Sequence, residues 1–356
     1  MAQQPVTKVN KRAELPGMFA RYRSWVEQGL FRAVPHAEAD SLYVLLQYHL
    51  GWVDQMGVPA QMAVSQGKAL RPTLCLFACH ALSESVDQAS PAAAALELIH
   101  NFSLVHDDIQ DQDRERRHQP TVWWLWGVPK ALVAGNAMQS VGDLALLDAT
   151  EEGASPEVTL RVSQLLTTSY LEMIEGQCMD LAFETKTTIT TDEYLKMIAC
   201  KTGALFRSGL EIGASLATDD LSEVEAFARF GSSIGRTFQI RDDYLGIWGD
   251  VATSGKAAGN DIRRRKKSFP VVFALGQAKG PALNDLTRIY QQDELEERDV
   301  DLVLNILEDV GSKQQSERII EKSAEEAIQS LKGLSLPAWA RKEAEELVDF
   351  LAYRDF

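Results

Sequence analysis

The chain has 356 residues, of which 45% are hydrophobic and 24% are charged, and its formal net charge is −15 at pH 7. This apolar content suffices for a buried core and excludes an intrinsically disordered protein, and the negative charge argues against a nucleic-acid partner. No apolar run approaches the ~20 residues of a membrane span, and the N-terminal residues lack the apolar segment of a signal peptide. The four cysteines form no Cys-x-x-Cys pair, so we expect a reduced, cytoplasmic protein.

The apolar periodicity predicts helices almost throughout the chain after a loose N-terminal tail at residues 1–16. Start signals support it: Ser155-Pro156-Glu157, for example, combines an N-cap residue, a first-turn proline and an acidic first turn. No linker rich in proline or glycine divides the chain, so we expect one all-α domain over residues 17–356. The predicted helices are 17–30, 36–57, 67–84, 91–113, 129–150, 156–186, 191–217, 220–249, 262–279, 283–294, 298–310, 314–333 and 337–353.

Three carboxylates follow an apolar run at the end of one predicted helix. Asp107 and Asp111 would lie one turn apart on the same face, where their repulsion weakens an isolated helix by a few tenths of a kcal/mol. Mg²⁺ would remove that cost, since it takes oxygen ligands from one or two carboxylates and from phosphates. The alternative is an ordinary solvated helix end. A second pair, Asp242 and Asp243, ends another apolar helix, which favours two acidic walls of a central cavity that face each other across a polyanion.

Basic residues cluster near these carboxylates despite the negative net charge. Lys68 and Arg71 stand three apart at a predicted helix start, where cations and free backbone N–H groups can hold an anion. Arg116 and Arg117 follow the first acidic stretch, and a basic run covers 263–267. Taken singly, each group would be read as a solvated surface. Together with bridging metal ions, they would allow an acidic protein to bind a polyphosphate.

In combination these motifs strongly resemble the trans-isoprenyl (polyprenyl) diphosphate synthase family over about Gly67 to Pro270. The resemblance implies a helical bundle of the isoprenoid synthase type. It also implies a reaction in which an allylic diphosphate ionises and isopentenyl diphosphate attacks the allylic carbon head-to-tail. The matching motifs are Gly67-Lys68-x-x-Arg71-Pro72, Ile99-His100-x-x-Ser103-Leu104-x-His106-Asp107-Asp108-Ile109-x-x-Asp111, Arg116-Arg117, Pro120-Thr121-Val122, Gly176-Gln177-x-x-Asp180-Leu181, Lys201-Thr202-Gly203, Phe238-Gln239-x-x-Asp242-Asp243, and Gly255-Lys256 before Asp261-Ile262.

The resemblance assigns roles to individual residues of this chain. Asp107, Asp111 and Asp242 would ligate Mg²⁺, as three ions per active site, with Asp108 and Asp243 in support. Developing charge on the pyrophosphate would be stabilised by the metal and by preplaced cations, and the pyrophosphate itself would take the final proton. The residues implied for the allylic diphosphate are Arg116, Lys201, Lys256 and, from the basic run, Lys266; those for isopentenyl diphosphate are Lys68, Arg71, His100 and Arg117; those flanking the carbocation are Lys201, Thr202 and Gln239.

Product length in the family is set by side chains below the first aspartate motif. Ser103 is small and falls almost directly beneath Asp107 on an ideal helix, whereas the blocking role of Phe102 rests on the resemblance. One helical turn of ~5.4 Å is similar to one extended isoprene unit. An aromatic residue at this position resembles geranylgeranyl diphosphate synthases, so we expect a twenty-carbon product, with the fifteen-carbon farnesyl diphosphate as the next candidate.

Three positions depart from the family pattern. Gly246 stands where many relatives have a third aspartate, His118 replaces a glycine after the paired arginines, and Asn136 replaces a common aspartate. Two alternative functions remain open: a synthase-like terpene cyclase, which would not need the isopentenyl-binding set, and a non-catalytic partner subunit, which would have lost metal-binding aspartates. The family also implies a homodimer, and we expect the tryptophans at 123, 124 and 126 to pack in the core or at a subunit interface.

Overall fold

The structure is a computed structural model that describes residues 15–36, 41–60, 67–186, 188–249, 259–292 and 294–355. Across these ranges the regular structure is helical apart from one short hairpin and one isolated bridge, which confirms the predicted all-α fold. None of the described helices combines the length and apolar character that a bilayer span requires. The predicted tail and Lys256 lie largely or wholly outside the described residues.

The elements follow the chain in this order. The first half contains α1 (Gly17–Ala33), α2 (Leu42–His49), α3 (Leu70–Leu82), the 3₁₀ turn η1 (Asp87–Ala89), α4 (Ser90–Gln110), strands β1 (Glu115–Arg116) and β2 (Gln119–Pro120), α5 (Val122–Trp126), α6 (Val128–Leu147) and η2 (Asp148–Thr150). The second half contains α7 (Pro156–Thr185), α8 (Thr191–Ile198), the π-helical turn η3 (Ala199–Gly203), α9 (Ala204–Ala217), α10 (Leu221–Trp248), α12 (Asn260–Arg263), α13 (Phe269–Gln277), α14 (Pro281–Ile289), α15 (Glu297–Asp309), α16 (Ser312–Leu331) and α17 (Ala338–Tyr353).

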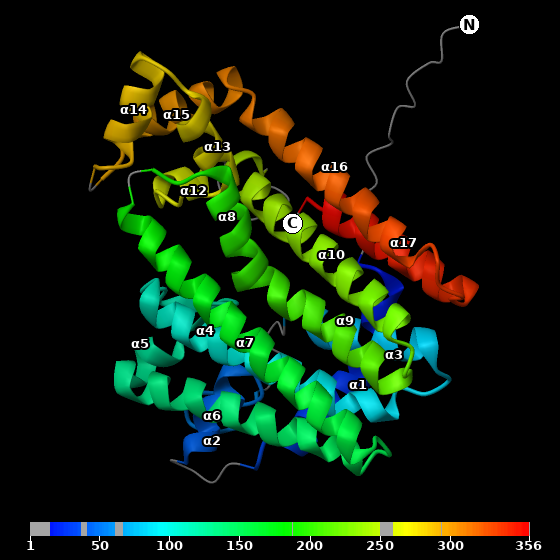
Figure 1. The fold of residues 1–356 in the computed structure, drawn as a ribbon. Helices are drawn as coiled ribbons and strands as arrows, with labels where there is room; N and C mark the ends of the chain where they lie inside the picture. Colours follow the sequence, from blue (N-terminus) through cyan, green and yellow to red (C-terminus); the bar gives the residue numbers. More distant parts are fainter. Residues whose placement is uncertain are drawn as a thin grey trace, which may run out of the picture.

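The long helices run alongside one another (Figure 1). Helix α4 packs against α6, α1 and α3, while α10 packs between α9 and α16. Helix α7 contacts both α6 and α9 and so joins the two halves of the bundle. The last helix, α17, lies beside α16 and returns the C-terminal residues to α10. Segments that are far apart in the sequence therefore surround the central helices α4 and α10.

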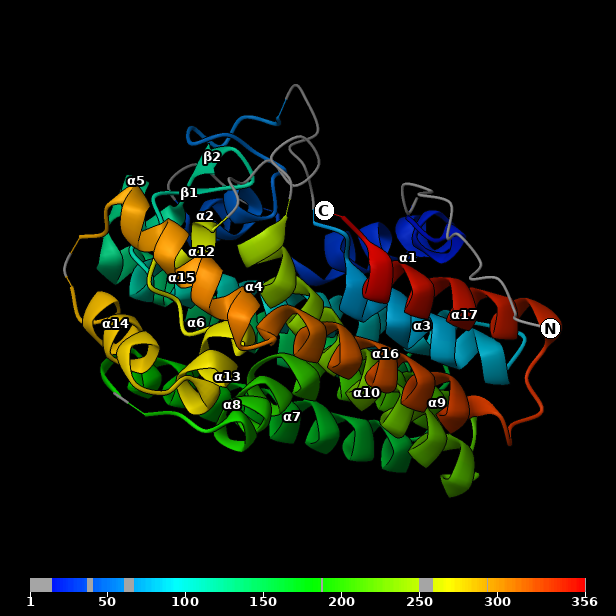
Figure 2. The same ribbon diagram turned by 90° about the horizontal axis from the view of Figure 1, so that it is seen from above.

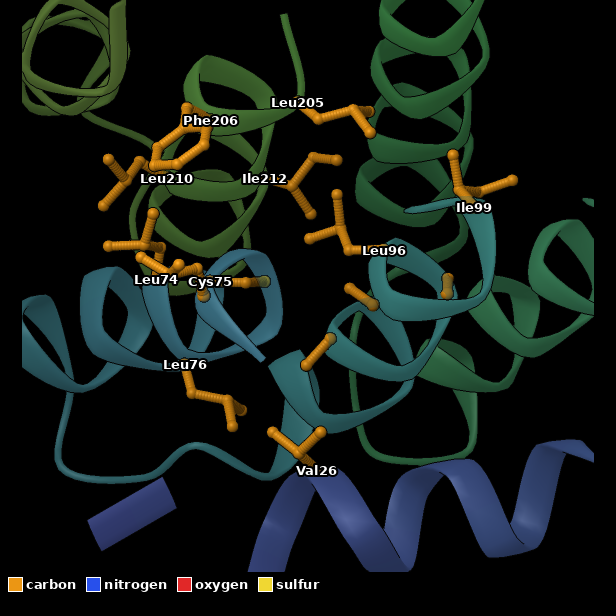
Figure 3. Packing of buried hydrophobic residues seen from close by; sticks show 14 of the residues in the cluster. Val26, Leu74, Cys75, Leu76, Leu96, Ile99, Leu205, Phe206, Leu210 and Ile212 are labelled. Atoms are coloured by element: carbon orange, nitrogen blue, oxygen red, sulfur yellow. The ribbon is translucent and has the colours of Figure 1, made fainter. Parts of the chain in front are cut away.

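The main core is built from apolar side chains of α1, α3, α4 and α9 (Figure 3). Leu74 of α3, Leu96 of α4 and Ile212 of α9 are completely buried, and burial of each such side chain stabilises the fold by ~1.5–3 kcal/mol. Helices α3 and α9 approach closely because Gly213 has no side chain: a Cβ there would lie 2.1 Å from the carbonyl oxygen of Cys75. Cys75 is completely buried and its thiol is free.

A second, smaller cluster of buried side chains lies at one end of the bundle, where α12 to α15 gather (Figure 2). Ile247 at the end of α10 packs into this cluster with Val271 and Val303. The cluster covers the end of α10 that follows the second aspartate pair. It therefore holds the loop at 264–268 over the same end of the bundle as the acidic residues.

Several predicted helices are shorter or broken in the structure. The predicted helix 36–57 is reduced to α2, because Gly51 and Gly57 adopt positive φ and the chain turns back on itself between them. The predicted helix 262–279 is two helices, since Arg265 has a φ of +54° and a new helix begins next to Pro270. The predicted helix 191–217 is continuous but contains the π-helical turn η3. The loop that follows Arg265 and the turn η3 contribute residues to the cavity described below.

Candidate active site

A cavity of about 600 Å³ lies between α4, α6, α7, α8, η3 and α10. It brings together residues from six separate motifs of the sequence, which agrees with the expected central cavity. The predicted site residues that line it are Arg71, His100, Phe102, Ser103, Asp107, Arg116, Lys201, Thr202, Gln239, Asp242 and Lys266.

The first acidic wall is the C-terminal end of α4. The N–H of Asp111 donates to the carbonyl of Asp107 at 2.8 Å, so the two residues are one helical turn apart as predicted. Burial raises the pKa of Asp107 to about 6; the nearby Lys201 opposes this shift, and the Asp111 carboxylate adds to it. Asp107 lines the cavity and Asp111 lies exposed beyond it. A cation bound at this wall would relieve the mutual repulsion of the two carboxylates.

Asp108 points away from the cavity and positions a cation. Its side chain is only 2% exposed, and Oδ1 accepts from Nε of Arg116 at 2.8 Å and lies 2.7 Å from Nη2. Burial raises the pKa of Asp108, while the hydrogen bond from Arg116 lowers it. This pair holds the Arg116 guanidinium against the cavity wall. Asp108 therefore acts through Arg116.

The second acidic wall is the end of α10, and its two aspartates also point in different directions. Asp242 lines the cavity with a side chain that is 53% exposed. Asp243 is completely buried: it accepts from the hydroxyl of Tyr194 at 2.5 Å and from the N–H of Phe269 at 3.1 Å. Burial raises its pKa to about 6. Asp243 thus ties α8, α10 and α13 together, and of the two aspartates only Asp242 faces the cavity.

The π-helical turn η3 presents polar groups to the cavity between the two acidic walls. Lys201 pairs with Asp180 of α7 at 2.5 Å. Thr202 donates its hydroxyl to Oε1 of Gln239 at 2.7 Å, which leaves the Gln239 amide to donate to Asp243 at 3.1 Å. The turn can approach α7 because Gly176 has no side chain: a Cβ there would lie 2.2 Å from the backbone nitrogen of Lys201.

A second cavity of about 270 Å³ adjoins the first and is strongly basic. It shares Arg71, His100 and Asp242 with the main cavity and adds Lys68, Arg117 and the buried carboxylate of Glu97, so the cations outnumber the carboxylates. Burial and the neighbouring Arg354 lower the pKa of Lys68 to about 8, and burial lowers that of Arg71 to about 10. Burial and the surrounding arginines hold the pKa of His100 well below its ordinary value, so the imidazole is neutral. Cations crowded in a poorly hydrated site are arranged to receive an anion.

Arg354, one residue beyond the last predicted helix (337–353), completes this basic cavity and was not predicted. Its side chain is only 3% exposed, lies with Cζ 4.2 Å from the Phe238 ring centroid and approaches Asp242 at 3.6 Å. Its buried Nη1 has no hydrogen-bond partner among the described residues. Two hydrogen bonds from Arg241 to the Arg354 carbonyl, at 2.9 and 2.7 Å, dock the C-terminus here. The only sequence signal was a basic residue near the end of the chain.

The basic run divides into separate roles. Lys266 lines the cavity, with Nζ 3.9 Å from Asp243 and 4.0 Å from Asp261. Lys267 donates to three backbone carbonyls at and beyond the C-terminal end of α7, at 2.6 to 3.0 Å, where a cation also complements the helix dipole. Arg264 pairs with Asp113 of the loop after α4 at 2.9 Å. Lys266 and Lys267 therefore both border the cavity, whereas Arg264 does not.

The structure shows the surroundings of the three residues that depart from the family pattern. A Cβ at Gly246 would lie 2.3 Å from Oδ2 of Asp261, so the carboxylate of Asp261 occupies the space beside that glycine. His118 has a φ of +64° in the two-residue turn between β1 and β2, a conformation that favours glycine. Asn136 of α6 lines the main cavity.

The apolar part of the cavity extends below Asp107. Phe102 is buried and lines it, in edge-to-face contact with His106 and with Tyr170 of α7. Ser103 lines it too, with its hydroxyl donated to the carbonyl of His100 at 2.7 Å. Both residues expected to control product length thus face the cavity.

The tryptophans of α5 are used mainly in packing. The indole N–H of Trp123 donates to the Asp113 carbonyl at 2.8 Å, and Trp126 stacks edge-to-face on Tyr48. Trp124 is about half exposed, with the Arg114 guanidinium 4.4 Å from its ring centroid. Core packing is therefore confirmed for two of the three rings.

The acidic walls suit a cation that is shared with a phosphate ligand. Within the part of the chain that the structure describes, no three His, Cys, Asp or Glu side chains form a metal site by themselves. Mg²⁺ does not need such a cage, since it commonly binds through one or two carboxylates together with substrate phosphates and water. Asp107 and Asp111 on one wall and Asp242 on the other provide this donor set, and the partly buried carboxylate of Asp107, whose pKa is raised, fits a bound cation.

Comparisons with known proteins agree with this geometry. Residues 54–307 match the family model described as polyprenyl synthetase. A (2E,6E)-farnesyl diphosphate synthase of Mycobacterium bovis is 44% identical over 231 residues, which are 65% of this chain and 62% of that relative. The geranylgeranyl diphosphate synthase of Mycobacterium tuberculosis is 36% identical over 303 residues, 85% of this chain and 84% of that protein.

A solved structure, the geranylgeranyl pyrophosphate synthetase of Pyrococcus horikoshii, superimposes with a TM-score of 0.85 at 32% identity. The superposition covers 95% of this chain and 98% of that one. The matched motifs, the helical bundle and the two facing acidic walls thus agree with one another. The chain belongs to the polyprenyl synthetase family.

Proposed function

We propose that this protein is a Mg²⁺-dependent prenyltransferase that condenses isopentenyl diphosphate head-to-tail with an allylic diphosphate to form a short-chain all-trans prenyl diphosphate. One observation carries the proposal: a cavity with two acidic walls opens into a basic cavity, and Arg71, His100 and Asp242 line both. Two anionic substrates would thus lie next to each other. One would be bound through metal ions on carboxylates and the other directly by cationic side chains. The names of the relatives, farnesyl and geranylgeranyl diphosphate synthases, support this reading.

The acidic cavity would bind the allylic diphosphate. Mg²⁺ held by Asp107, Asp111 and Asp242, expected as three ions, would neutralise the diphosphate and stabilise the charge that develops on it as the C–O bond breaks. Arg116, which Asp108 holds in place, and Lys201 would place fixed positive charge on the same leaving group.

The polar groups of η3 would face the allylic carbon. The Thr202 hydroxyl and the Gln239 carbonyl form a hydrogen bond beside Lys201, and Gln239 is anchored in turn to buried Asp243. Oriented oxygens of this kind stabilise a carbocation without supplying a nucleophile. The proton lost after condensation would go to the pyrophosphate, so no side chain of this chain need act as the base.

The basic cavity would bind isopentenyl diphosphate. Lys68, Arg71, Arg117 and Arg354 supply the positive charge, and neutral His100 can donate or accept a hydrogen bond beside them. A terpene cyclase uses one diphosphate substrate and has no need of this second cation set. A non-catalytic subunit has no need of the acidic walls.

Geranylgeranyl diphosphate is the favoured product and farnesyl diphosphate is the second candidate. The buried Phe102 ring at the end of the cavity would limit the growing chain. It stands five residues before Asp107, an axial distance of ~7.5 Å on a helix.

A homodimer is the expected assembly. Helices α6 and α7 are neighbours (Figure 1). Their exposed apolar side chains would form a surface that a second copy covers. This surface comprises Val128, Leu132, Val133, Leu144, Leu147, Leu160 and Leu171. Sedimentation of the unaltered chain and of Leu144→Asp tests it: the variant should shift towards monomer.

The function is tested by incubating the purified full chain with Mg²⁺, isopentenyl diphosphate and each allylic primer in turn, and sizing the product alcohols. The expected result is elongation that requires both substrates and stops when Mg²⁺ is chelated. Release of hydrocarbons from a prenyl diphosphate without isopentenyl diphosphate would establish the cyclase instead. Absence of any turnover would favour the partner-subunit alternative.

A further inference from the structure

The apolar end of the main cavity is backed by a second layer of side chains. Phe102 of α4 lines the cavity, and its ring meets that of Tyr170 of α7 edge-to-face, with the centroids 6.3 Å apart and the planes at 86°. The Tyr170 hydroxyl in turn donates to Oδ2 of Asp143 of α6 at 3.3 Å. Of these three residues, only Phe102 lines the cavity. Three helices therefore meet behind the residue that closes it.

The packing of α4 on α6 shows that this layer lies on the side away from the acidic wall. His106 of α4 is hydrogen-bonded to the Leu132 carbonyl of α6 at 3.3 Å. Further along, a Cβ on Gly142 would lie 3.3 Å from the side chain of Ile99. The two helices are thus antiparallel, and Asp143 stands at the level below Phe102.

We propose that Tyr170, held in place by Asp143, is a positioning residue for product length, because it fixes the Phe102 ring across the end of the cavity. This inference rests on the proposed function. An edge-to-face aromatic pair favours its own geometry by a factor of roughly 2 to 10. The hydroxyl bond to Asp143 restrains the Tyr170 ring in turn, since a partly buried phenol is held by its hydrogen-bond partner.

The size of the Tyr170 ring predicts how much longer the product becomes when that ring is removed. If the Tyr170 ring is removed, the Phe102 ring can rotate into the vacated space, over the 6.3 Å that separates the two centroids. The ring that is removed has six carbons and an isoprene unit has five, so the vacated space is about the size of one isoprene unit. The cavity would then accept a product longer by one isoprene unit.

The test compares the product distributions of Tyr170→Ala, Phe102→Ala and the double variant under identical conditions. Tyr170→Ala should raise the ratio of the next longer product at least about threefold. The double variant should match Phe102→Ala, because Tyr170 acts through the Phe102 ring and coupled residues are not additive. Tyr170→Phe and Asp143→Ala, which keep the ring and remove only the hydroxyl bond, should give a smaller lengthening.

Leu166→Ala is the matched control, since Leu166 is buried one turn earlier on α7 and does not line the cavity. It should lower the melting temperature and leave product length unchanged. If Tyr170→Ala does not fold, Tyr170→Leu replaces it with the same expectation.

Three results would overturn the inference or its basis. A wild-type product ratio in a folded Tyr170 variant, alongside longer products from Phe102→Ala, would show that the second layer has no role. Products of the double variant longer than those of Phe102→Ala would show that Tyr170 does not act through Phe102. A lack of elongation by the unaltered chain would refute the proposed function itself, and the inference with it.

Discussion

Replacement of Arg354 by alanine tests whether the C-terminal residues belong to the isopentenyl diphosphate site. The guanidinium is nearly excluded from solvent, borders the basic cavity and has one nitrogen without a partner among the described residues. Burial lowers its pKa to about 10, which still leaves it charged at neutral pH. Arg354 has one carboxylate neighbour, Asp242 at 3.6 Å, and lies beside the further cation Lys68, so an anionic ligand would add a favourable interaction. The variant should therefore bind isopentenyl diphosphate less tightly.

The magnitude follows from the interaction that is lost. A hydrogen bond to a charged group contributes ~1.5–3 kcal/mol, and ~1.4 kcal/mol corresponds to a tenfold change in affinity. The KM for isopentenyl diphosphate should therefore rise about 10- to 100-fold. The change in kcat should be much smaller, because the interaction is made equally before and during the reaction. The C-terminus should stay docked, since Arg241 bonds to the backbone carbonyl of residue 354, which alanine retains.

Steady-state kinetics with isopentenyl diphosphate varied at a saturating allylic primer provide the assay. Arg354→Lys should recover part of the affinity, because it restores the charge without the planar stacking on Phe238. Lys342→Ala, on the exposed face of the same helix α17, serves as the control and should behave as wild type. A KM within twofold of wild type in a correctly folded Arg354→Ala variant would refute the reasoning.

Three further predictions concern the walls and the hairpin of the site. Asp107→Ala should lower kcat at least ~10²–10³-fold at saturating Mg²⁺, and near-normal turnover would rule out its metal role. Because the pKa of Lys68 is lowered to about 8, its cation is lost as the pH rises through that value, so kcat/KM for isopentenyl diphosphate should fall above pH 8. Lys68→Arg should flatten this profile, and an unchanged profile would show that another group titrates. His118→Gly should stabilise the protein by about 1 kcal/mol, since non-glycine residues with positive φ are strained; calorimetry should show a higher melting temperature, with no such gain for His118→Ala.

Much of the fold and of the site could be predicted because the signals are local. Apolar periodicity and start signals such as Ser155-Pro156 define long helices, and the structure begins α7 at that proline. The one-turn spacing of Asp107 and Asp111 follows from helix geometry alone. The predicted helix 36–57 was wrong in extent because two glycines with positive φ end the helix early, a tendency that apolar periodicity does not reveal.

The orientation of adjacent carboxylates could not be read from the sequence in the same way. Asp107 and Asp108 look equivalent there, yet only Asp107 faces the cavity, while Asp108 is buried against Arg116. Asp242 and Asp243 divide similarly between the cavity and an internal network. Successive residues on a helix point about 100° apart, and only the packing of the neighbouring helices decides which direction is the cavity.

By itself, the sequence determined an all-α chain with two acidic helix ends, an accompanying set of cations and membership of one enzyme family, because helix periodicity and motif spacing are properties of short segments. Only the tertiary structure decided that Arg354 joins the basic cavity, that Asp261 takes the space beside Gly246, and that Tyr170 and Asp143 stand behind Phe102. Each of these contacts joins side chains at least 15 positions apart in the chain, and their meeting depends on how whole helices pack.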